Sequence, residues 1–123
     1  MIILKPHGKT GWQRLFCAFQ YSKKGLIEAF KTESAFRQEC ALAFILIPLG
    51  LWLGQDALSR ALLVASILQI LIVEILNSAL EVTIDRISSE HHPLSGRAKD
   101  FGSAAVFLSL ILAASVWLCV LIG

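Results

Sequence analysis

Three long runs of hydrophobic residues divide the chain, and each is long enough to form a helix that crosses a bilayer. The runs cover about residues 34–53, 57–87 and 101–123, and a helical span needs about 20 residues. An earlier segment, about residues 10–31, places apolar side chains on one helical face and mostly cations and polar groups on the other. The pattern predicts an all-α membrane protein with three transmembrane helices and an N-terminal amphipathic helix in the membrane interface.

The amphipathic helix is expected to begin at Thr10, whose hydroxyl suits an N-cap position. Its basic and aromatic side chains allow two interpretations. Arg14, Tyr21 and Ser22 could reach a phosphate or a lipid headgroup, or the helix could simply anchor the chain to the membrane surface.

Polar residues interrupt the second hydrophobic run on one helical face only. At 100° per residue a single stripe contains Glu74, Asn77, Ser78, Glu81 and Asp85. A carboxylate exposed to hydrocarbon is costly, so this stripe should face a bundle interior or a water-filled cleft. A polar seam between helices would explain Asn77 and Ser78. It would not explain two glutamates about 10 Å apart along the helix axis, so we interpret the stripe as a functional site.

Composition and charge agree with a membrane protein and predict its orientation. Hydrophobic residues make up 56% of the chain, and the mean hydropathy is +0.71. The net charge is only +2, but ten of the eleven Lys and Arg residues lie in residues 1–37 and 86–99. The positive-inside rule therefore places the N-terminus and residues 88–100 in the cytoplasm and the C-terminus in the periplasm. Because these cations flank membrane spans, we expect no nucleic-acid partner.

Residues 88–99 are expected to form a polar loop before the third membrane helix. The loop carries Gly96, Arg97 and Lys99, and cations beside a helix N-terminus can bind an anion. Basic residues at a cytoplasmic membrane edge are common, so this signal is weak alone. Beside a carboxylate stripe it gains weight, because phosphoryl transfer needs carboxylates for Mg²⁺, cations for the moving charge and a base for the hydroxyl. His91 and His92 are adjacent in the loop, which does not suit a zinc site.

Three segments resemble one known family. They are Glu74-Ile-Leu-Asn77-Ser-Ala-Leu-Glu81-x-x-x-Asp85, Ser-Gly-Arg-Ala-Lys99-Asp100 and Ala35-Phe-Arg-Gln-Glu39. The chain, from about Arg14 to its C-terminus, resembles the small prokaryotic integral-membrane diacylglycerol kinases. The resemblance implies a homotrimer with active sites shared between chains in the bacterial inner membrane. It also implies transfer of a phosphoryl group from MgATP to diacylglycerol, which gives phosphatidic acid.

The resemblance also implies roles for individual residues. Glu74 would be the general base, assisted by Asn77 and Lys99, and Glu33 and Glu81 would bind Mg²⁺. ATP would contact Arg14, Tyr21, Glu33, Asn77, Glu81, Glu90, His92, Lys99 and Asp100. The lipid would contact Arg14, Phe19, Ser22, Gln38, Glu39, Glu74 and Ser103. The chain departs from the family pattern at Phe19, where a small residue is usual, and at Lys23, where an aromatic residue is usual.

Three alternatives remain at this point. The related undecaprenol kinases share the Glu/Asn/Glu stripe, although the Ala35–Glu39 segment resembles the diacylglycerol branch. A small ion or proton carrier could also use intramembrane carboxylates, but it would not need Arg97 and Lys99. Glu33 could form only a surface pair with Arg37, four residues later. We also expect that three thin helices of one chain cannot both bury the Glu74–Asp85 stripe and enclose a nucleotide, which favours a site shared between chains.

Overall fold

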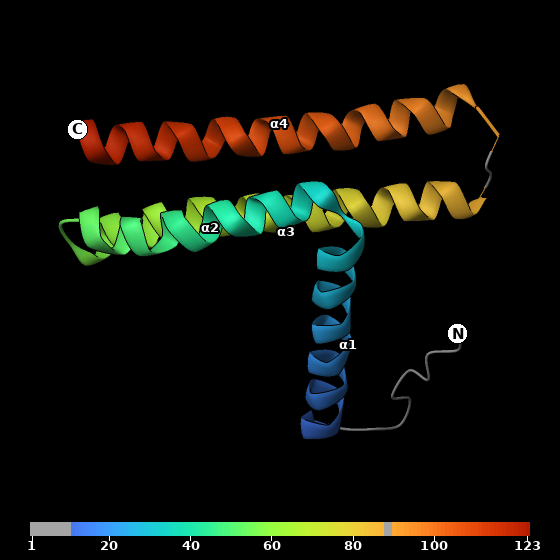
Figure 1. Cartoon of the computed structure of the whole chain (residues 1–123), viewed down its shortest axis with the longest axis horizontal. Helices are drawn as coiled ribbons and strands as arrows, with labels where there is room; N and C mark the ends of the chain where they lie inside the picture. The colour runs from blue at the N-terminus through green and yellow to red at the C-terminus, as the bar shows by residue number, and fades with distance from the viewer. Residues whose placement is uncertain (1–10, 88–89) are drawn as a thin grey trace.

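The structure is a computed structural model, and it describes residues 11–87 and 90–123. The described chain is helical, with α1 at Gly11–Thr32, α2 at Ser34–Leu53, α3 at Ala57–Ile87 and α4 at Pro93–Ile122 (Figure 1). The bounds of α2 and α3 coincide with the second and third predicted helices. Thr10, the predicted N-cap of the first helix, lies outside the described residues.

Helices α2, α3 and α4 run side by side, whereas α1 projects crosswise from this bundle (Figure 1). Helix α3 packs against both α2 and α4, and α1 makes most of its contacts with α2. The polar stripe lies on α3. The helix that carries the candidate chemistry therefore has a neighbour on two sides.

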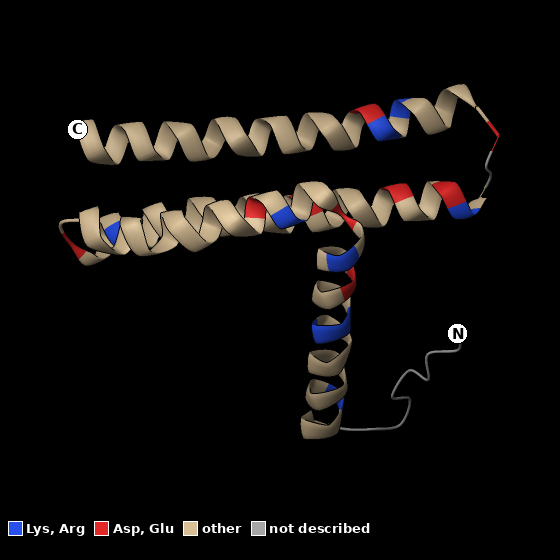
Figure 2. Cartoon of the chain, viewed as in Figure 1, with Lys and Arg blue, Asp and Glu red and all other residues tan. Residues whose placement is uncertain are grey.

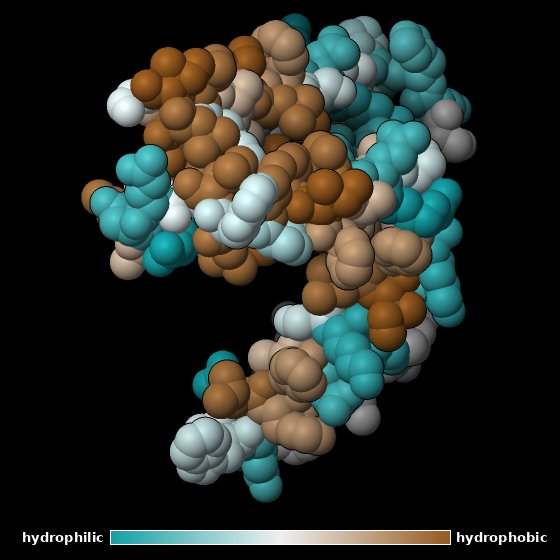
Figure 3. Space-filling view, turned by 60° about the vertical axis from the view of Figure 1, so that its left-hand side comes forward, coloured by the Kyte–Doolittle hydropathy of each residue, from teal (hydrophilic) through white to brown (hydrophobic). Residues whose placement is uncertain are grey.

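Three of the helices suit a membrane environment. By length and composition α2, α3 and α4 could each cross a bilayer, which confirms the predicted all-helical class with three apolar helices. Brown hydrophobic side chains cover much of the visible face of the bundle (Figure 3). Large apolar side chains such as Phe44 and Trp52 are 83% and 80% exposed. A surface this apolar needs lipid or further protein against it.

The last helix begins earlier than predicted. Helix α4 starts at Pro93, not near residue 101, so residues 94–100 are helical and the prediction of a loop there is wrong. The reason lies in the first turn: His92 is the N-cap, its Nδ1 accepts from the Leu94 backbone N–H at 3.0 Å, and Pro93 occupies a first-turn position. Gly96, Arg97 and Lys99 therefore project from the first two turns of a helix.

The junction of α1 and α2 is held by Arg37. Its Nη1 donates to the backbone carbonyls of Phe30 at 2.8 Å and Lys31 at 3.0 Å. These carbonyls belong to the last turn of α1, where helical partners are missing. The predicted alternative of a Glu33–Arg37 pair is wrong, because the guanidinium turns back to α1. The ion pair found among the described residues joins Lys99 to Asp85.

The half of the bundle away from α1 has an apolar core. Ala43 of α2, Ile67 and Ile70 of α3 and Ala113 of α4 form one buried cluster. Two of the four are alanines, so the three helices can approach closely at this level.

A polar network ties α3 to α4 beside that core. Trp117 Nε1 donates to Ser66 Oγ at 3.0 Å and to the Leu63 carbonyl at 3.3 Å. Gln69 Nε2 donates to the carbonyls of Ser66 at 3.0 Å and Ser109 at 2.7 Å. These bonds satisfy polar groups that would be costly in an apolar setting. The network fixes the rotation of α3 relative to α4, and with it the direction of the stripe.

Candidate active site

Most charged residues lie on α1 or at one end of the bundle of α2, α3 and α4. Figure 2 shows them along α1, near the α1–α2 junction, and on the parts of α3 and α4 close to their connection, with Asp56 and Arg60 at the α2–α3 turn as exceptions. From Phe101 onwards, α4 has no Asp, Glu, Lys or Arg. The polar stripe lies in the transition between this charged end and the uncharged bundle.

One part of the stripe faces α2. Glu74 and Ser78 are buried, with 6% and 9% of their surface exposed. Ser78 Oγ donates to Glu33 Oε1 at 3.2 Å. Glu33 is the N-cap residue of α2, but its side chain makes no capping hydrogen bond, so its carboxylate is available to α3. Within this one chain α2 covers Glu74 and Ser78, whereas Glu81 is half-buried and Asp85 is exposed.

Glu39 brings a second carboxyl group to Glu74. The two carboxyl groups are close enough to interact. Two carboxylates so close repel each other when both are ionised. The Oε1 atom of Glu39 is buried and has no hydrogen-bond partner among the described residues. Glu39 was assigned to the lipid from the sequence, and the structure places it directly beside Glu74.

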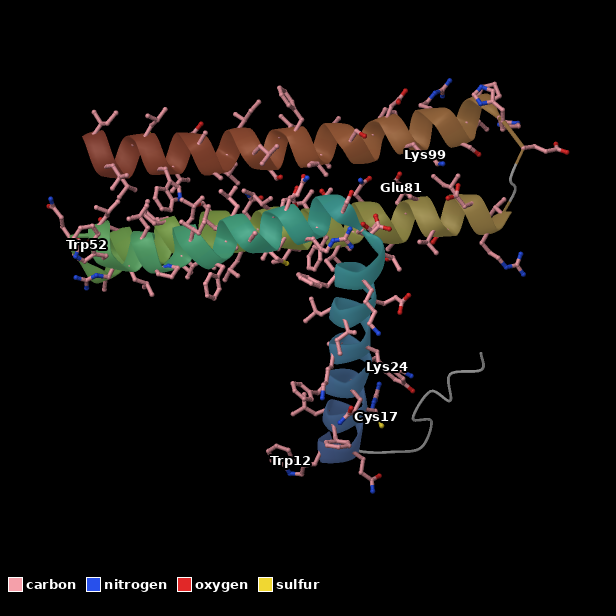
Figure 4. All side chains as sticks on the ribbon, in the orientation of Figure 1. Trp12, Cys17, Lys24, Trp52, Glu81 and Lys99 are labelled. Carbon is pink, nitrogen blue, oxygen red and sulfur yellow. The ribbon has the colours of Figure 1, made fainter. Side chains whose placement is uncertain are left out.

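The other part of the stripe faces α4. Asn77 Nδ2 donates to Glu81 Oε2 at 3.4 Å, one helical turn further along α3. Asn77 Oδ1 is buried and accepts no hydrogen bond from the described residues. Gly102 of α4 lies against this oxygen. Glu81 and Lys99 lie in the space between α3 and α4 (Figure 4).

A pocket opens where α3 ends and α4 begins. Its volume is about 350 Å³, and its lining includes Asp85, Glu90, His92, Lys99 and Asp100. Lys99 Nζ contacts Asp85 Oδ1 at 3.0 Å across it. The structure therefore brings together four residues assigned to ATP from the sequence: Glu90, His92, Lys99 and Asp100.

Only the C-terminal half of α1 lies near the stripe. A cleft of about 660 Å³ between α1 and α3 is lined by Ser22, Glu33 and Ser78, among other residues. Trp12 and Cys17 lie towards the other end of α1, far from Glu81 of α3 and Lys99 of α4 (Figure 4). The predicted phosphate contacts Arg14 and Tyr21 line a groove formed by α1 residues alone.

The remaining predicted lipid contacts are not gathered into one pocket. Phe19 lines a groove on α1, and Gln38 and Ser103 are exposed on α2 and α4. Within one chain, the residues assigned to the lipid are therefore spread over all four helices.

The carboxylates of this site suit an Mg²⁺ ion that binds together with ATP better than a metal ion held by protein ligands alone. Among the described residues, no three His, Cys, Asp or Glu side chains converge as a metal-binding group. Protein Mg²⁺ sites commonly use one or two carboxylates and take their other ligands from substrate phosphates and water. Glu33 and Glu81 fit that donor set, and each contacts a polar residue of the α3 stripe: Glu33 contacts Ser78, and Glu81 contacts Asn77.

Comparison with known proteins identifies the family. The model of the family described as prokaryotic diacylglycerol kinase matches residues 20–121. This chain belongs to the prokaryotic diacylglycerol kinase family. The match includes most of α1 and all of the stripe, the Lys99 pocket and Gly102.

Curated diacylglycerol kinases resemble the chain over nearly its whole length. The enzyme of Escherichia coli K12 is 50% identical over 113 residues, which is 92% of each chain. The enzyme of Haemophilus influenzae Rd is 50% identical over 108 residues, or 88% of this chain and 92% of its relative. The Pseudomonas aeruginosa PAO1 enzyme is 47% identical over 116 residues, or 94% of each.

Proposed function

We propose that this chain transfers the γ-phosphoryl group of ATP to the free hydroxyl of diacylglycerol, giving phosphatidic acid and ADP. The observation that carries the proposal is the arrangement along α3. A buried carboxyl group, Glu74, lies on the same helical stripe as Asp85, which borders the Lys99 pocket. Family membership supports phosphoryl transfer as the chemistry that joins these two ends.

Glu74 is proposed as the general base. It accepts the proton of the lipid hydroxyl as that oxygen bonds to the γ-phosphorus. The bond from the γ-phosphorus to the β–γ bridging oxygen breaks, and ADP leaves with that oxygen. The exposed side chain of Lys99 can leave Asp85, and its positive charge would then offset the negative charge on the transferred group.

Glu33 and Glu81 are the proposed Mg²⁺ ligands. Held by these carboxylates together with ATP, Mg²⁺ would offset negative charge on the phosphate groups. Ser78 orients the carboxylate of Glu33, and Asn77 orients that of Glu81. A carboxylate whose position is fixed before the substrate arrives loses little entropy on binding.

The remaining proposed contacts of ATP and of the lipid come from residues around Glu74 and Lys99 and from α1. Glu90, His92, Lys99 and Asp100 share the pocket between α3 and α4, which supports their assignment to ATP. Glu39 lies beside Glu74, which supports a place near the reacting lipid hydroxyl. The further proposed contacts are Arg14 and Tyr21 for ATP, and Arg14, Phe19, Ser22, Gln38 and Ser103 for the lipid.

The proposed location is the bacterial inner membrane, with the N-terminus and residues 88–100 in the cytoplasm. The C-terminus would then be periplasmic. The crosswise α1 supports an interfacial helix, because an element that leaves the bundle sideways can lie along the membrane surface (Figure 1). Its exposed apolar side chains, including Trp12 at 85% and Phe16 at 63%, would enter the headgroup region.

A homotrimer with shared sites is the proposed assembly. Arg14 lies in a groove formed by α1 alone, so a second chain would have to bring it to the nucleotide. The test mixes two inactive variants, Asp100→Asn and Glu74→Gln, and verifies subunit exchange. Activity should return if the two residues of one working site come from different chains. Verified exchange without any activity would contradict sharing of these two residues.

The experiment for the proposed reaction uses the purified chain in mixed micelles with radiolabelled ATP and Mg²⁺. Label should enter the lipid fraction when diacylglycerol is present, and not when the lipid alcohol is omitted. Undecaprenol in place of diacylglycerol tests the alternative acceptor. Faster labelling of undecaprenol would reassign the substrate, and no labelled lipid with either alcohol would reject the kinase proposal.

A further inference from the structure

Gly102 of α4 lies in the interface with α3, directly against Asn77 and Leu80. It is buried within α4. A Cβ atom at this position would overlap Asn77 Oδ1, and would lie 3.2 Å from both Asn77 Cγ and Leu80 Cδ2. Glycine is unfavourable inside a helix, so a close approach is the physical reason for its presence here.

The orientation of the Asn77 amide depends on this contact. Its Oδ1 atom faces Gly102, and its Nδ2 atom donates to Glu81. The reverse orientation would place the amide oxygen against the Glu81 carboxylate, where both groups only accept hydrogen bonds. The amide therefore has one favourable orientation, and that orientation needs the space beside Gly102.

We infer that Gly102 is a positioning residue for the Asn77–Glu81 pair. It allows the α4 backbone to approach the amide, which keeps Nδ2 directed at the Glu81 carboxylate. A methyl group at residue 102 would force either the amide to rotate or α4 to retreat. Each movement lengthens a contact that is already 3.4 Å, and so releases Glu81 from its partner.

The inference deepens the proposed function, because it rests on Glu81 as a ligand of Mg²⁺. Gly102 itself is not among the residues assigned to ATP or to the lipid. Its effect should therefore appear chiefly in how the enzyme uses the metal.

The kinetic test compares Gly102→Ala with Gly50→Ala. Gly50 is a second close-approach glycine, where a Cβ would lie 3.0 Å from Leu63 Cβ and 3.5 Å from Trp117 Cζ2, away from the stripe. Gly102→Ala should lower kcat by about 10- to 100-fold, the scale of a misplacement near 1 Å. It should also raise the Mg²⁺ concentration for half-maximal rate and leave KM for diacylglycerol unchanged. Gly50→Ala should lower only the unfolding midpoint.

A second test needs no catalysis and separates this inference from the proposed reaction. Unfolding in a detergent titration is measured for Gly102→Ala, Asn77→Ala and the double variant. Gly102→Ala should destabilise the wild-type chain, but should have little effect once Asn77→Ala has removed the obstructing amide. Equal destabilisation in both backgrounds would overturn the inference, as would unchanged kcat and Mg²⁺ dependence in Gly102→Ala. If the wild-type chain labels no lipid, the proposed reaction fails and this cycle still decides whether Gly102 positions Asn77.

Discussion

Lys99 Nζ lies 3.0 Å from Asp85 Oδ1, and this ion pair connects α4 to the end of α3 across the pocket between them. Both side chains keep substantial exposure, 41% for Lys99 and 66% for Asp85. Exposed pairs of this kind contribute about 0.2–1 kcal/mol. The pair is therefore weak enough for Lys99 to exchange Asp85 for a phosphate oxygen.

Lys99→Met should impair catalysis while preserving the fold. We expect kcat to fall at least about tenfold, because a cation opposite the transferred phosphoryl group is lost. The comparison variant is Asp85→Asn, which removes the partner but keeps the cation. It should change KM for ATP by less than about fivefold, in line with a weak exposed pair. Steady-state kinetics with varied ATP measures both, and wild-type kinetics in Lys99→Met would show that the charge serves only membrane topology.

Glu74→Gln should abolish most turnover without unfolding the chain. The amide keeps the size of the buried side chain but cannot accept the hydroxyl proton, so kcat should fall by about 10²–10⁴-fold. Nucleotide binding, measured by protection from thermal unfolding, should persist. Asp56→Asn, an acid-to-amide change in the α2–α3 turn, is the matched control. Retention of more than about a tenth of kcat would contradict the base assignment.

Glu33→Gln and Glu81→Gln should each raise the Mg²⁺ concentration needed for half-maximal activity. The two residues lie on α2 and α3, and each would lose a charged oxygen donor for the metal. Titrating activity against Mg²⁺ at fixed ATP measures the effect. An unchanged Mg²⁺ dependence in both variants would remove the metal assignment.

Arg37→Ala should loosen the junction between α1 and α2. Its guanidinium bonds to the carbonyls of Phe30 and Lys31 would be lost, and for an exposed side chain we expect a cost of about 1 kcal/mol. Backbone amides around residues 30–34 should then exchange hydrogen faster. Lys24→Ala removes a cation from α1 without touching the junction and should leave that exchange unchanged. Equal exchange in the two variants would show that the junction does not depend on Arg37.

The turn between α2 and α3 should contribute a small acid-sensitive part of the stability. The Ser59 backbone N–H donates to Asp56 Oδ1 at 2.8 Å, and this bond, helped by Arg60, lowers the pKa of Asp56 below its usual value. Because the folded-state pKa is the lower one, the stabilisation is complete above the unfolded pKa of about 3.9. It is lost as pH falls through the folded value. Asn accepts the same bond but does not titrate, so Asp56→Asn should lack this loss when unfolding is followed from pH 6 down to about pH 3.

Hydropathy was sufficient to predict α2 and α3. Their apolar runs are continuous and are separated by Gly54, so the bounds 34–53 and 57–87 follow from composition and turn chemistry alone. The start of α4 was not predictable in this way. It depends on a side-chain cap, His92 Nδ1 to Leu94 N–H, that stabilises a helix in a stretch of polar composition.

The polar stripe was predicted as one surface, yet the structure divides it between two neighbours. Glu74 and Ser78 turn towards α2, and Asn77 towards α4. Helical periodicity places residues around a single helix but carries no information on how its neighbours are rotated. The roles of Gly102 and Arg37 were hidden for the same reason, since each depends on one contact with another helix.

The early start of α4 would reduce the entropic cost of the proposed ATP binding. Gly96, Lys99 and Asp100 extend from a backbone that is already helical, whereas a phosphate-binding loop would have to be ordered by its ligand. Fixing one residue's backbone costs about 1–2 kcal/mol, so even a few loop residues would offset much of the affinity for ATP. A segment that is already helical avoids this entropy cost. Calorimetry should therefore find only a small unfavourable conformational entropy when the nucleotide binds.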